Sequence, residues 1–578
     1  MISGHTLLLQ GYEVTILEKG TNVGGVWKYT DNNSNKVEPM YKSLVTNLPK
    51  EVMAYNEEYP FNDNLPSFIT HSTVQSYLEE FCMKSNIYKH IKFSSEVMKC
   101  TYNNSNNTWS IQYIDHATVD KPISTTINTP TTLTEAYTTQ SLCDTSGSVY
   151  KKLEVDYLVV CNGHYSKPYT PPITNSHLFT GKQVHSITYD VLTVYTNQRV
   201  LVVGSRSSGT DIARELNGVA TQVYVSDRNW PPPDPSIPGT DTASSSTVTG
   251  STSGIIHYPG ISRFTGGKGV EFVDGRVVHD VDVIIWCTGY LYRYPFLVDY
   301  IKSTSSSEHK DMNDCTTTTN TATTTDHDDN SAVLAFQSPS WAEADLGGEG
   351  SPAVPGLYHQ LIFSRQPSLA FVGLPYAIVP FPLFYIQSLY LAAVWSNGGG
   401  TCIPDKECMN SNIYQHESTL YEQYGTVLHR SYHYLGGQLH HDYLLSLINE
   451  IQTFTSTNNS DTNKKGHNSD PSVPDYDRLI VYIKMLQEIY LDVQEHRPAY
   501  VGGPDDYRKR NYILDRLAVF ILCIYNRVLC CCKVVCSIPY IVSYMFTIIY
   551  LAHALYLYGR ASVCVYEYIL YNIFLCLY

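Results

Sequence analysis

Short runs of apolar residues, each followed by a turn, recur along this chain. Four of them lie at 14–17, 157–161, 199–203 and 282–287. Apolar runs of this length bounded by turn residues are typical of strands buried in a parallel sheet. The third run leads into a helical segment and then into another apolar run, which is the order of a βαβ unit. The pattern therefore predicts an α/β protein with parallel sheets.

The third run opens a complete strand–turn–helix–strand unit, RVLVVGSRSSGTDIARELNGVATQVYVSDR. Gly204 permits the tight turn, and Gly209 permits close packing of the helix on the strand. The start of the helix, at Thr210, can hold a pyrophosphate, because a helix N-terminus presents free N–H groups and the positive end of its dipole. Arg206 replaces the middle glycine of G-x-G-x-x-G, so the strand–turn–helix context carries the assignment.

Arg228 follows the second strand of this unit. A cation at this position favours a 2′-phosphate, and hence NADP over NAD. Asp227 beside it weakens this preference. Taken alone, Arg228 is almost equally well explained as a solvated loop arginine.

Residues 1–30 read as helix, turn, strand and glycine turn, which predicts a second unit of this kind. Gly4 can act as the third glycine of the pattern, and Glu18, at the end of the strand, can accept hydrogen bonds from two ribose hydroxyls. Only three residues precede Gly4, so the first strand and the first two glycines are missing. We expect either a sequence truncated at its N-terminus or a protein that binds this dinucleotide poorly.

Composition narrows the class of protein. The 578 residues include 43% apolar and 16% charged residues, which excludes a chain that is disordered over most of its length. The net charge of −15 argues against binding a nucleic-acid backbone, which requires a basic surface. The 15 cysteines lack the spacing of a zinc site or a disulfide framework. We therefore expect no nucleic-acid partner and no metal.

The C-terminal tail, 516–578, is apolar, and its segment 538–558 contains no Asp, Glu, Lys or Arg over 21 residues. Such a segment could cross a bilayer core of about 30 Å or lie in one leaflet. A buried core helix is the alternative, and Pro539 weakens any simple helix. The location expected is intracellular, at the endoplasmic reticulum membrane if the tail inserts and in the cytoplasm otherwise.

A group of motifs carries a family resemblance. The segment FTGKQVHSITYD fits the pattern F-x-G-x-x-x-H-x-x-x-[YF], with Phe179, Gly181, His185 and Tyr189 at its fixed positions. In this respect the chain resembles the flavin-containing monooxygenases, most of all their plant and fungal branch. The further matching segments are EKGTNVGGVWKYT, YKSLVTNLPKEVMAY, VVCNGHYSKP, DVIIWCTGYLYRYPFL and PSLAFVGLPYAIVPFPLFYIQS. Together they cover about residues 3–450 in the family's order.

The resemblance implies two Rossmann-like dinucleotide-binding domains, with an NADP domain inserted into an FAD domain. On this basis the expected division is: FAD domain 1–190 and 281–450, with a low-complexity insert at 303–332; NADP domain 191–280; divergent extension 451–515; apolar tail 516–578.

The resemblance also implies a reaction. NADPH reduces FAD, and the reduced flavin and O₂ form a C4a-hydroperoxyflavin that oxygenates a soft nitrogen or sulfur atom of a small molecule. This corresponds to an N,N-dimethylaniline-type or S-oxygenating enzyme. Two alternatives stay open: a catalytically inactive flavoprotein relic or binding protein, suggested by the missing first strand, and an uncoupled NADPH oxidase that releases H₂O₂.

Matching the family's motifs to this sequence residue by residue implies a set of site residues. Asn47, in TNLP, is expected beside the reactive part of the flavin and NADP, where a neutral amide can both donate and accept a hydrogen bond. His185 is expected to support the link between the domains rather than to transfer a proton. The residues expected at the FAD are Gly4, Glu18, Gly24, Gly25, Val26, Trp27, Thr46, Asn47, Thr288 and Gly289. Those expected at the NADP are Gly204, Ser208, Gly209, Thr210, Asp211 and Arg228. Without the resemblance, the same residues have plainer interpretations. Asn47 would be a turn residue before a proline, and Gly24–Trp27 would be a turn followed by a core tryptophan. Thr288 and Gly289 would serve only packing.

Overall fold

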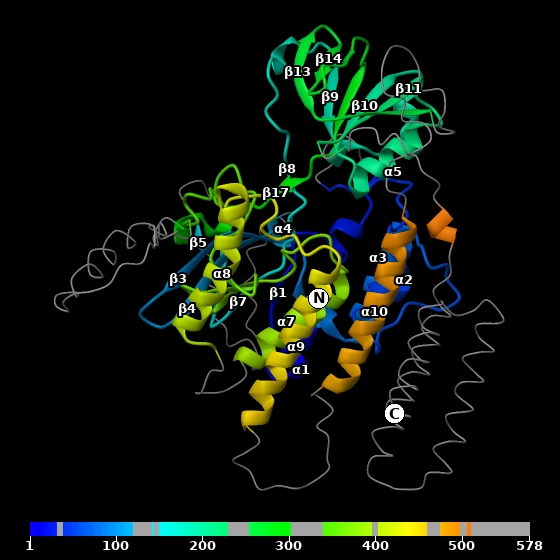
Figure 1. Cartoon of the computed structure of the whole chain (residues 1–578). Helices are drawn as coiled ribbons and strands as arrows, with labels where there is room; N and C mark the ends of the chain where they lie inside the picture. The colour runs from blue at the N-terminus through cyan, green and yellow to red at the C-terminus, as the bar shows by residue number, and fades with distance from the viewer. Residues whose placement is uncertain are drawn as a thin grey trace, which may run out of the picture.

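The computed structural model describes residues 1–31, 38–119, 142–143, 149–228, 230, 254–301, 339–395, 403–458, 474–497 and 506–509. Figure 1 shows a smaller lobe at the top of the view, built on strands β9 to β14 and helix α5, above a larger lobe that contains most of the helices. The predicted insert at 303–332 and the apolar tail at 516–578 lie outside the described residues.

The smaller lobe is built on a five-stranded parallel sheet in the order β12-β11-β10-β16-β9. Its strands are β9 (Lys182–His185), β10 (Arg199–Val203), β11 (Gln222–Ser226), β12 (Ile255–Tyr258) and β16 (Val283–Trp286). Strands β9 and β16 both lie outside the range 191–280 that the sequence predicts for this domain. The inserted domain is therefore larger than predicted at both ends, because the two flanking strands pair with each other next to β10.

Helix α5 (Ser207–Leu216) covers this sheet directly after β10. Its buried residues Ile212, Ala213 and Leu216 recur at helical spacing and pack in one cluster with Val200 and Val202 of β10. The predicted βαβ unit is thus present, with both strands at their expected positions. A smaller antiparallel sheet contains β13 (Ile261–Gly266), β14 (Gly269–Phe272) and β15 (Val277–Val278).

Two short strands join the lobes. Strand β8 (Lys167–Pro168) enters the smaller lobe and β17 (Tyr290–Leu291) leaves it, and the two pair antiparallel. Figure 1 shows this pair at the junction of the lobes. The chain therefore crosses the junction twice at one place, which positions the sites of the two lobes against each other.

The larger lobe contains three sheets. Strand β1 (Ile16–Leu17) pairs parallel with β2 (Ile91–Lys92). Strand β7 (Leu158–Val160) pairs parallel with β20 (Leu369–Phe371), which continues to β19 (Ile362–Phe363) and β18 (Leu357–Tyr358). An antiparallel sheet contains β3 (Ser95–Asn103), β4 (Thr108–Asp115), β6 (Val149–Val155) and β5 (Leu142–Cys143). Strands β1 and β7 lie in separate sheets.

Helices surround these sheets. Helix α1 (Ile2–Leu9) packs on α7 (Pro380–Trp395), where Ser388 Oγ lies 2.8 Å from Ser3 Oγ. Helix α7 is buried over most of its surface, so it forms the centre of the largest hydrophobic cluster. Further helices in the described part of the larger lobe are α2 (Lys50–Met53), α3 (His71–Lys84), α4 (His116–Val119), α8 (Lys406–Tyr424), α9 (Gln438–Asn458) and α10 (Tyr476–His496).

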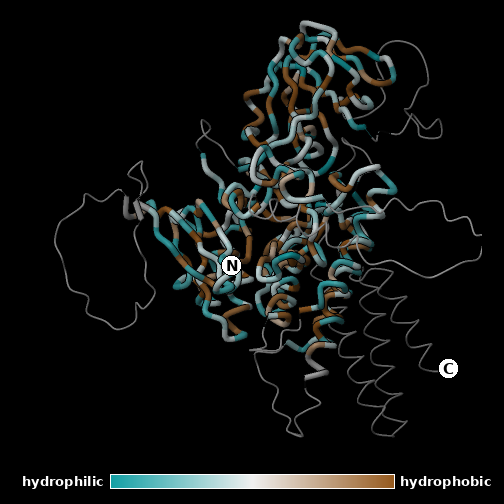
Figure 2. Tube along the Cα trace, turned by 90° about the vertical axis from the view of Figure 1, so that its left-hand side faces the viewer, coloured by the Kyte–Doolittle hydropathy of each residue, from teal (hydrophilic) through white to brown (hydrophobic). Residues whose placement is uncertain are grey.

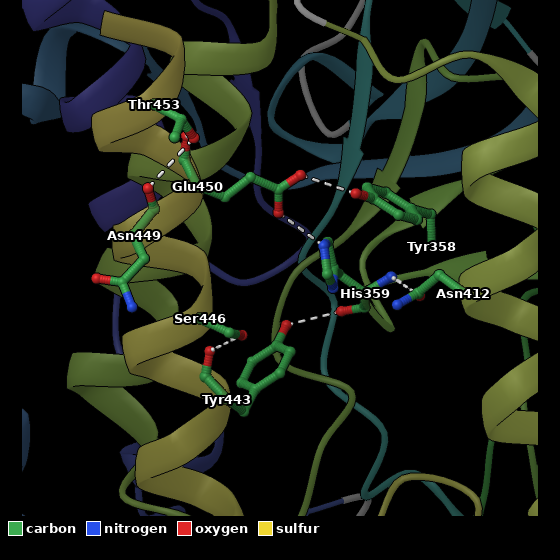
Figure 3. Close-up of polar contacts among 8 residues, drawn as sticks. All are labelled: Tyr358, His359, Asn412, Tyr443, Ser446, Asn449, Glu450 and Thr453. Atoms are coloured by element: carbon green, nitrogen blue, oxygen red, sulfur yellow. Dashed lines mark hydrogen bonds and ion pairs between the residues drawn. The ribbon is translucent and has the colours of Figure 1, made fainter. Parts of the chain in front are cut away.

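Glu450 attaches α9 to the sheet of the larger lobe. Its carboxylate accepts hydrogen bonds from Tyr358 Oη and His359 Nε2, both at 2.8 Å, as Figure 3 shows. Burial would raise the pKa of Glu450, but the contact with His359 lowers it, so the carboxylate stays charged. On the same helix, Tyr443 donates to the carbonyl oxygen of His359 at 2.7 Å. This part of the helical layer is therefore fixed to the sheet by side chains as well as by apolar packing.

Figure 2 shows hydrophobic residues running through the interior of both lobes. Among the described residues, no helix is both long and apolar enough to cross a membrane. The predicted span at 538–558 lies outside those residues, so membrane association of the tail stays a prediction.

Candidate active site

One cavity of about 3490 Å³ lies between the two lobes. It is several times larger than the roughly 300–1,000 Å³ typical of a small-molecule pocket. Every residue that the sequence predicts at the FAD or the NADP lines it, with the exception of Gly209. The tertiary structure therefore brings the two predicted dinucleotide sites to one opening.

On the smaller lobe, the turn after β10 is shaped by two glycines. Gly204 has a φ of +100°, and a Cβ there would lie 2.6 Å from the carbonyl oxygen of Cys287. A Cβ on Gly209 would lie 1.8 Å from the carbonyl oxygen of Gly204, so this buried residue makes the close helix–strand packing possible without lining the cavity. Thr210 Oγ1 donates to the carbonyl oxygen of Ser205 at 2.7 Å, and Ser208 is exposed to the cavity. The arrangement fits a phosphate cradle at the start of α5.

Asp211 lines the cavity and is also bound by an arginine from the C-terminal part of the chain. Its carboxylate accepts two hydrogen bonds from Arg508 Nη2, at 2.9 and 3.0 Å. Burial raises the pKa of Asp211, while Arg508 opposes that shift. The contact joins the C-terminal segment Asp506–Lys509 to α5, so we interpret Asp211 as a residue of the lobe interface. Arg228, directly after β11, is exposed and lines the cavity.

On the larger lobe, Gly4 and Glu18 lie beside β1. A Cβ on Gly4 would lie 2.7 Å from Ile16 Cδ1, so Gly4 allows α1 to pack on β1, which is the role of a third glycine. Glu18 Oε1 accepts a hydrogen bond from the backbone N–H of Gly20 at 2.6 Å. This contact fixes the carboxylate at the end of the strand, where it lines the cavity.

The predicted turn Gly24–Trp27 forms a short 3₁₀ helix at Gly25–Trp27. Gly24 has a φ of +121°, and a Cβ there would clash with the Gln75 side chain. Val26 and Trp27 are half-buried and face the cavity, and Trp27 contacts the Phe381 ring edge-on at 6.4 Å. Trp27 therefore fits both interpretations of this turn, because it packs on the core as a core tryptophan would and also lines the cavity where an FAD residue is expected.

Thr46 and Asn47 precede α2. Thr46 is buried, and its Oγ1 accepts a hydrogen bond from the backbone N–H of Ile69 at 3.1 Å, so its side chain holds the loop in place. Asn47 Nδ2 donates to Ser207 Oγ at 2.9 Å. Ser207 is the first residue of α5, so this bond joins the two lobes at the cavity.

Thr288 and Gly289 follow β16 at the junction. Thr288 Oγ1 donates to the carbonyl oxygen of Tyr169 at 2.5 Å, and Gly289 has a φ of +80°. His185 Nδ1 accepts from the N–H of Ile187 at 3.2 Å, which leaves the proton on Nε2 for the carbonyl oxygen of Gly289 at 3.1 Å. Burial lowers the pKa of His185 to about 4. His185 is therefore a neutral residue that holds the junction.

Sequence reasoning missed two kinds of residue. Ser207 adjoins the predicted Ser208, and only its contact with Asn47 reveals its place. Arg430 is far from Gly289 in sequence, but its side chain lies against this glycine. A Cβ on Gly289 would be 2.6 Å from Arg430 Nη2. Nothing in the sequence pattern around Arg430 points to the site.

The family model described as Flavin-binding monooxygenase-like matches residues 1–128 and 142–231. The chain is 28% identical over 436 residues to the flavin-containing monooxygenase FMO GS-OX-like 2 of Arabidopsis thaliana, which covers 71% of this chain and 74% of that protein. It is 26% identical over 471 residues to FMO GS-OX5 of the same plant, covering 78% and 82%.

Solved structures have a similar fold. The S-allyl-L-cysteine S-oxygenase of Allium sativum superposes with a TM-score of 0.59 at 24% identity, covering 90% of this chain and 95% of that one. Tmm of a Pelagibacter strain superposes with a TM-score of 0.55 at 19% identity, covering 88% and 90%. At these identities the likeness establishes the fold.

Proposed function

Because this chain belongs to the flavin-containing monooxygenase family, whose members depend on FAD and NADPH, we propose that it oxygenates a nitrogen or sulfur atom of a small molecule. The balanced reaction takes substrate, O₂, NADPH and one proton to the oxygenated substrate, NADP⁺ and water. Sulfur is the first atom to test, because the name of one similar structure is S-allyl-L-cysteine S-oxygenase.

The observation that carries the proposal is the shared cavity. Residues expected at FAD and residues expected at NADPH line one space, and Asn47 and Ser207 meet at the point where we expect the two groups to come together. When bound, FAD and NADPH supply the electrons and the activation of O₂ that oxygenation requires. The protein has to place the two groups in contact and to keep water from the reacting atoms.

Several residues fit the cofactors. The glycine turn at Gly204 and the start of α5 fit the diphosphate of NADPH, because Gly204 lines the cavity and Gly209 lets α5 pack close to the turn. Glu18, held by the N–H of Gly20, fits a ribose, and Trp27 and Thr288 lie where the rest of FAD would pass. Asn47 would orient the nicotinamide and flavin edges through its amide, which adds no charge.

No proton-transfer step is assigned to His185. Burial holds its pKa at about 4, and its ring nitrogens are engaged by Ile187 and Gly289. Its neutral ring instead keeps the backbone of Gly289 in place beside the cavity.

A second candidate is an NADPH oxidase that releases H₂O₂. The same cavity-lining residues would hold FAD and NADPH in either enzyme, so the products formed per NADPH distinguish the two candidates. The inactive relic or binding protein is a third outcome of the same experiment.

The test begins with the absorption spectrum of the purified full chain after incubation with FAD and removal of free cofactor. The chain is then supplied with NADPH, O₂ and an organic sulfide, and sulfoxide and H₂O₂ are measured per NADPH consumed. We expect retained flavin bands and sulfoxide formation. Retained flavin with H₂O₂ alone would identify the oxidase, and protein without flavin would contradict the proposal.

A further inference from the structure

Three arginines line the same part of the cavity: Arg206, Arg228 and Arg430. Within the part of the chain that the structure describes, none of the three forms an ion pair with a carboxylate. The other arginines of the smaller lobe do have carboxylate partners, as Arg199 with Asp280 and Arg263 with Glu271 illustrate. Uncompensated guanidinium groups gathered at a cavity favour an anionic ligand.

Tyrosines hold two of these arginines together. The Arg206 guanidinium lies 5.5 Å from the ring centres of both Tyr376 and Tyr434, which is within cation–π range. Tyr376 Oη also donates to the carbonyl oxygen of Arg430 at 2.7 Å. Arg206, from the turn before α5, is therefore connected through one tyrosine to Arg430 on the larger lobe.

Arg430 is packed more tightly than the other two. Its guanidinium lies 4.5 Å from the ring centre of Tyr169 and in contact with Gly289. Burial lowers the pKa of Arg430, and the charges of Arg228 and Arg206 lower it further. The pKa of the neighbouring His429 is lowered by burial and by the charges of Arg228 and Arg430. The cluster thus carries a concentration of like charge that a bound anion would relieve.

We propose that Arg430, together with Arg206 and Arg228, binds a phosphate group of NADPH, so that the cofactor is held from both lobes. A guanidinium can offer two parallel N–H donors to phosphate oxygens, which suits three arginines that have no carboxylate partner among the described residues. Arg206 adjoins the turn at the start of α5, and Arg228 follows β11, the strand after which a 2′-phosphate is bound in this class of unit. Arg430 would be a specificity residue that lies outside the inserted domain. This inference rests on the proposed function.

The test is isothermal titration calorimetry of the purified full chain with NADP⁺ and, separately, NAD⁺. The Arg430→Gln variant is expected to bind NADP⁺ about 10- to 100-fold more weakly than the unchanged protein, because it loses one charge-assisted contact. The matched control is Arg263→Gln, because Arg263 is on the smaller lobe, pairs with Glu271 at 2.8 Å and does not line the cavity. The control should bind NADP⁺ like the unchanged protein.

The NAD⁺ titration identifies the phosphate. If Arg430 binds the 2′-phosphate, Arg430→Gln will weaken NADP⁺ alone, and if it binds the diphosphate, both nucleotides will weaken by a similar factor. Unchanged NADP⁺ affinity in Arg430→Gln would overturn the inference.

A second variant distinguishes a loss of binding from a folding defect. Arg206→Gln alters an exposed side chain and should weaken NADP⁺ binding in the same direction, with an unchanged melting temperature. Full affinity in Arg430→Gln overturns this inference alone, whereas an unchanged protein that binds no NADP⁺ overturns the proposed function as well.

Discussion

Asn47 Nδ2 donates a hydrogen bond to Ser207 Oγ at 2.9 Å, and this contact spans the two lobes. Asn47 belongs to the loop before α2, and Ser207 is the first residue of α5. Both line the cavity, so the bond fixes the Asn47 amide at the meeting point of the two predicted cofactor sites. A side chain in this place can affect the reaction without itself exchanging a proton.

We expect Asn47→Ala to uncouple NADPH oxidation from product formation. Removing the amide frees Ser207 and opens space for water beside the reacting atoms. The measurement is the ratio of oxygenated product to H₂O₂ per NADPH in the FAD-loaded chain, and the ratio should fall. The control is Asn64→Ala, at an exposed position away from the cavity. An unchanged ratio in Asn47→Ala would count against its role.

Gly209→Ala should abolish the NADP site. The added Cβ would lie 1.8 Å from the carbonyl oxygen of Gly204, so α5 or the turn would have to move. NADP⁺ binding by calorimetry should drop at least tenfold, while bound FAD should be retained. Gly218→Ala is the matched control, because its new Cβ would have only one contact, at 3.8 Å. Equal affinities in the two variants would refute the assignment.

Arg508→Ala should destabilise the protein. It removes from the partly buried Asp211 carboxylate the arginine that binds it at 2.9 Å and leaves Arg214 Nη1 at 3.9 Å, so the cost should lie below the roughly 3–5 kcal/mol typical of breaking a fully buried ion pair. The melting temperature by calorimetry should fall by several degrees. Combining Arg508→Ala with Asp211→Asn should restore part of the loss, since no unpaired charge remains. A double variant as unstable as the single one would show that another contact is responsible.

Stability should decrease as the solution is acidified below about pH 6.5. Burial lowers the pKa of His185 and His441 to about 4 and that of His440 to about 3, from 6.5 in the unfolded chain. Between the folded and unfolded pKa values the unfolded chain binds more protons, so each residue can contribute a loss of up to about 1.4 kcal/mol per pH unit.

The melting temperature between pH 7 and pH 5 tests this expectation. His441→Phe removes one such group and should make the decline shallower than in the unchanged protein. His177→Phe, at an exposed position, should leave the slope as it was. A slope that is the same in His441→Phe as in the unchanged protein would contradict the expectation.

Much of the fold was predictable because local patterns specify it. The run 199–203 is β10, the helix after it is α5, and the run at 282–287 contains β16. Apolar periodicity and turn glycines act over a few residues, so a sequence can reveal them. The extent of the inserted domain was not predictable in this way, because β9 and β16 join its sheet through long-range pairing that no local pattern encodes.

The candidate site divides in the same way. The sequence alone determined the α/β class, the glycine turn at Gly204 and the motifs that include Asn47 and Thr288, because residue type and spacing express them directly. Only the tertiary structure decided that Asp211 pairs with Arg508, that Asn47 reaches Ser207 and that Arg430 lies against Gly289. These contacts join residues separated by more than a hundred positions. They depend on how the two lobes pack, which is a property of the whole chain and not of any segment.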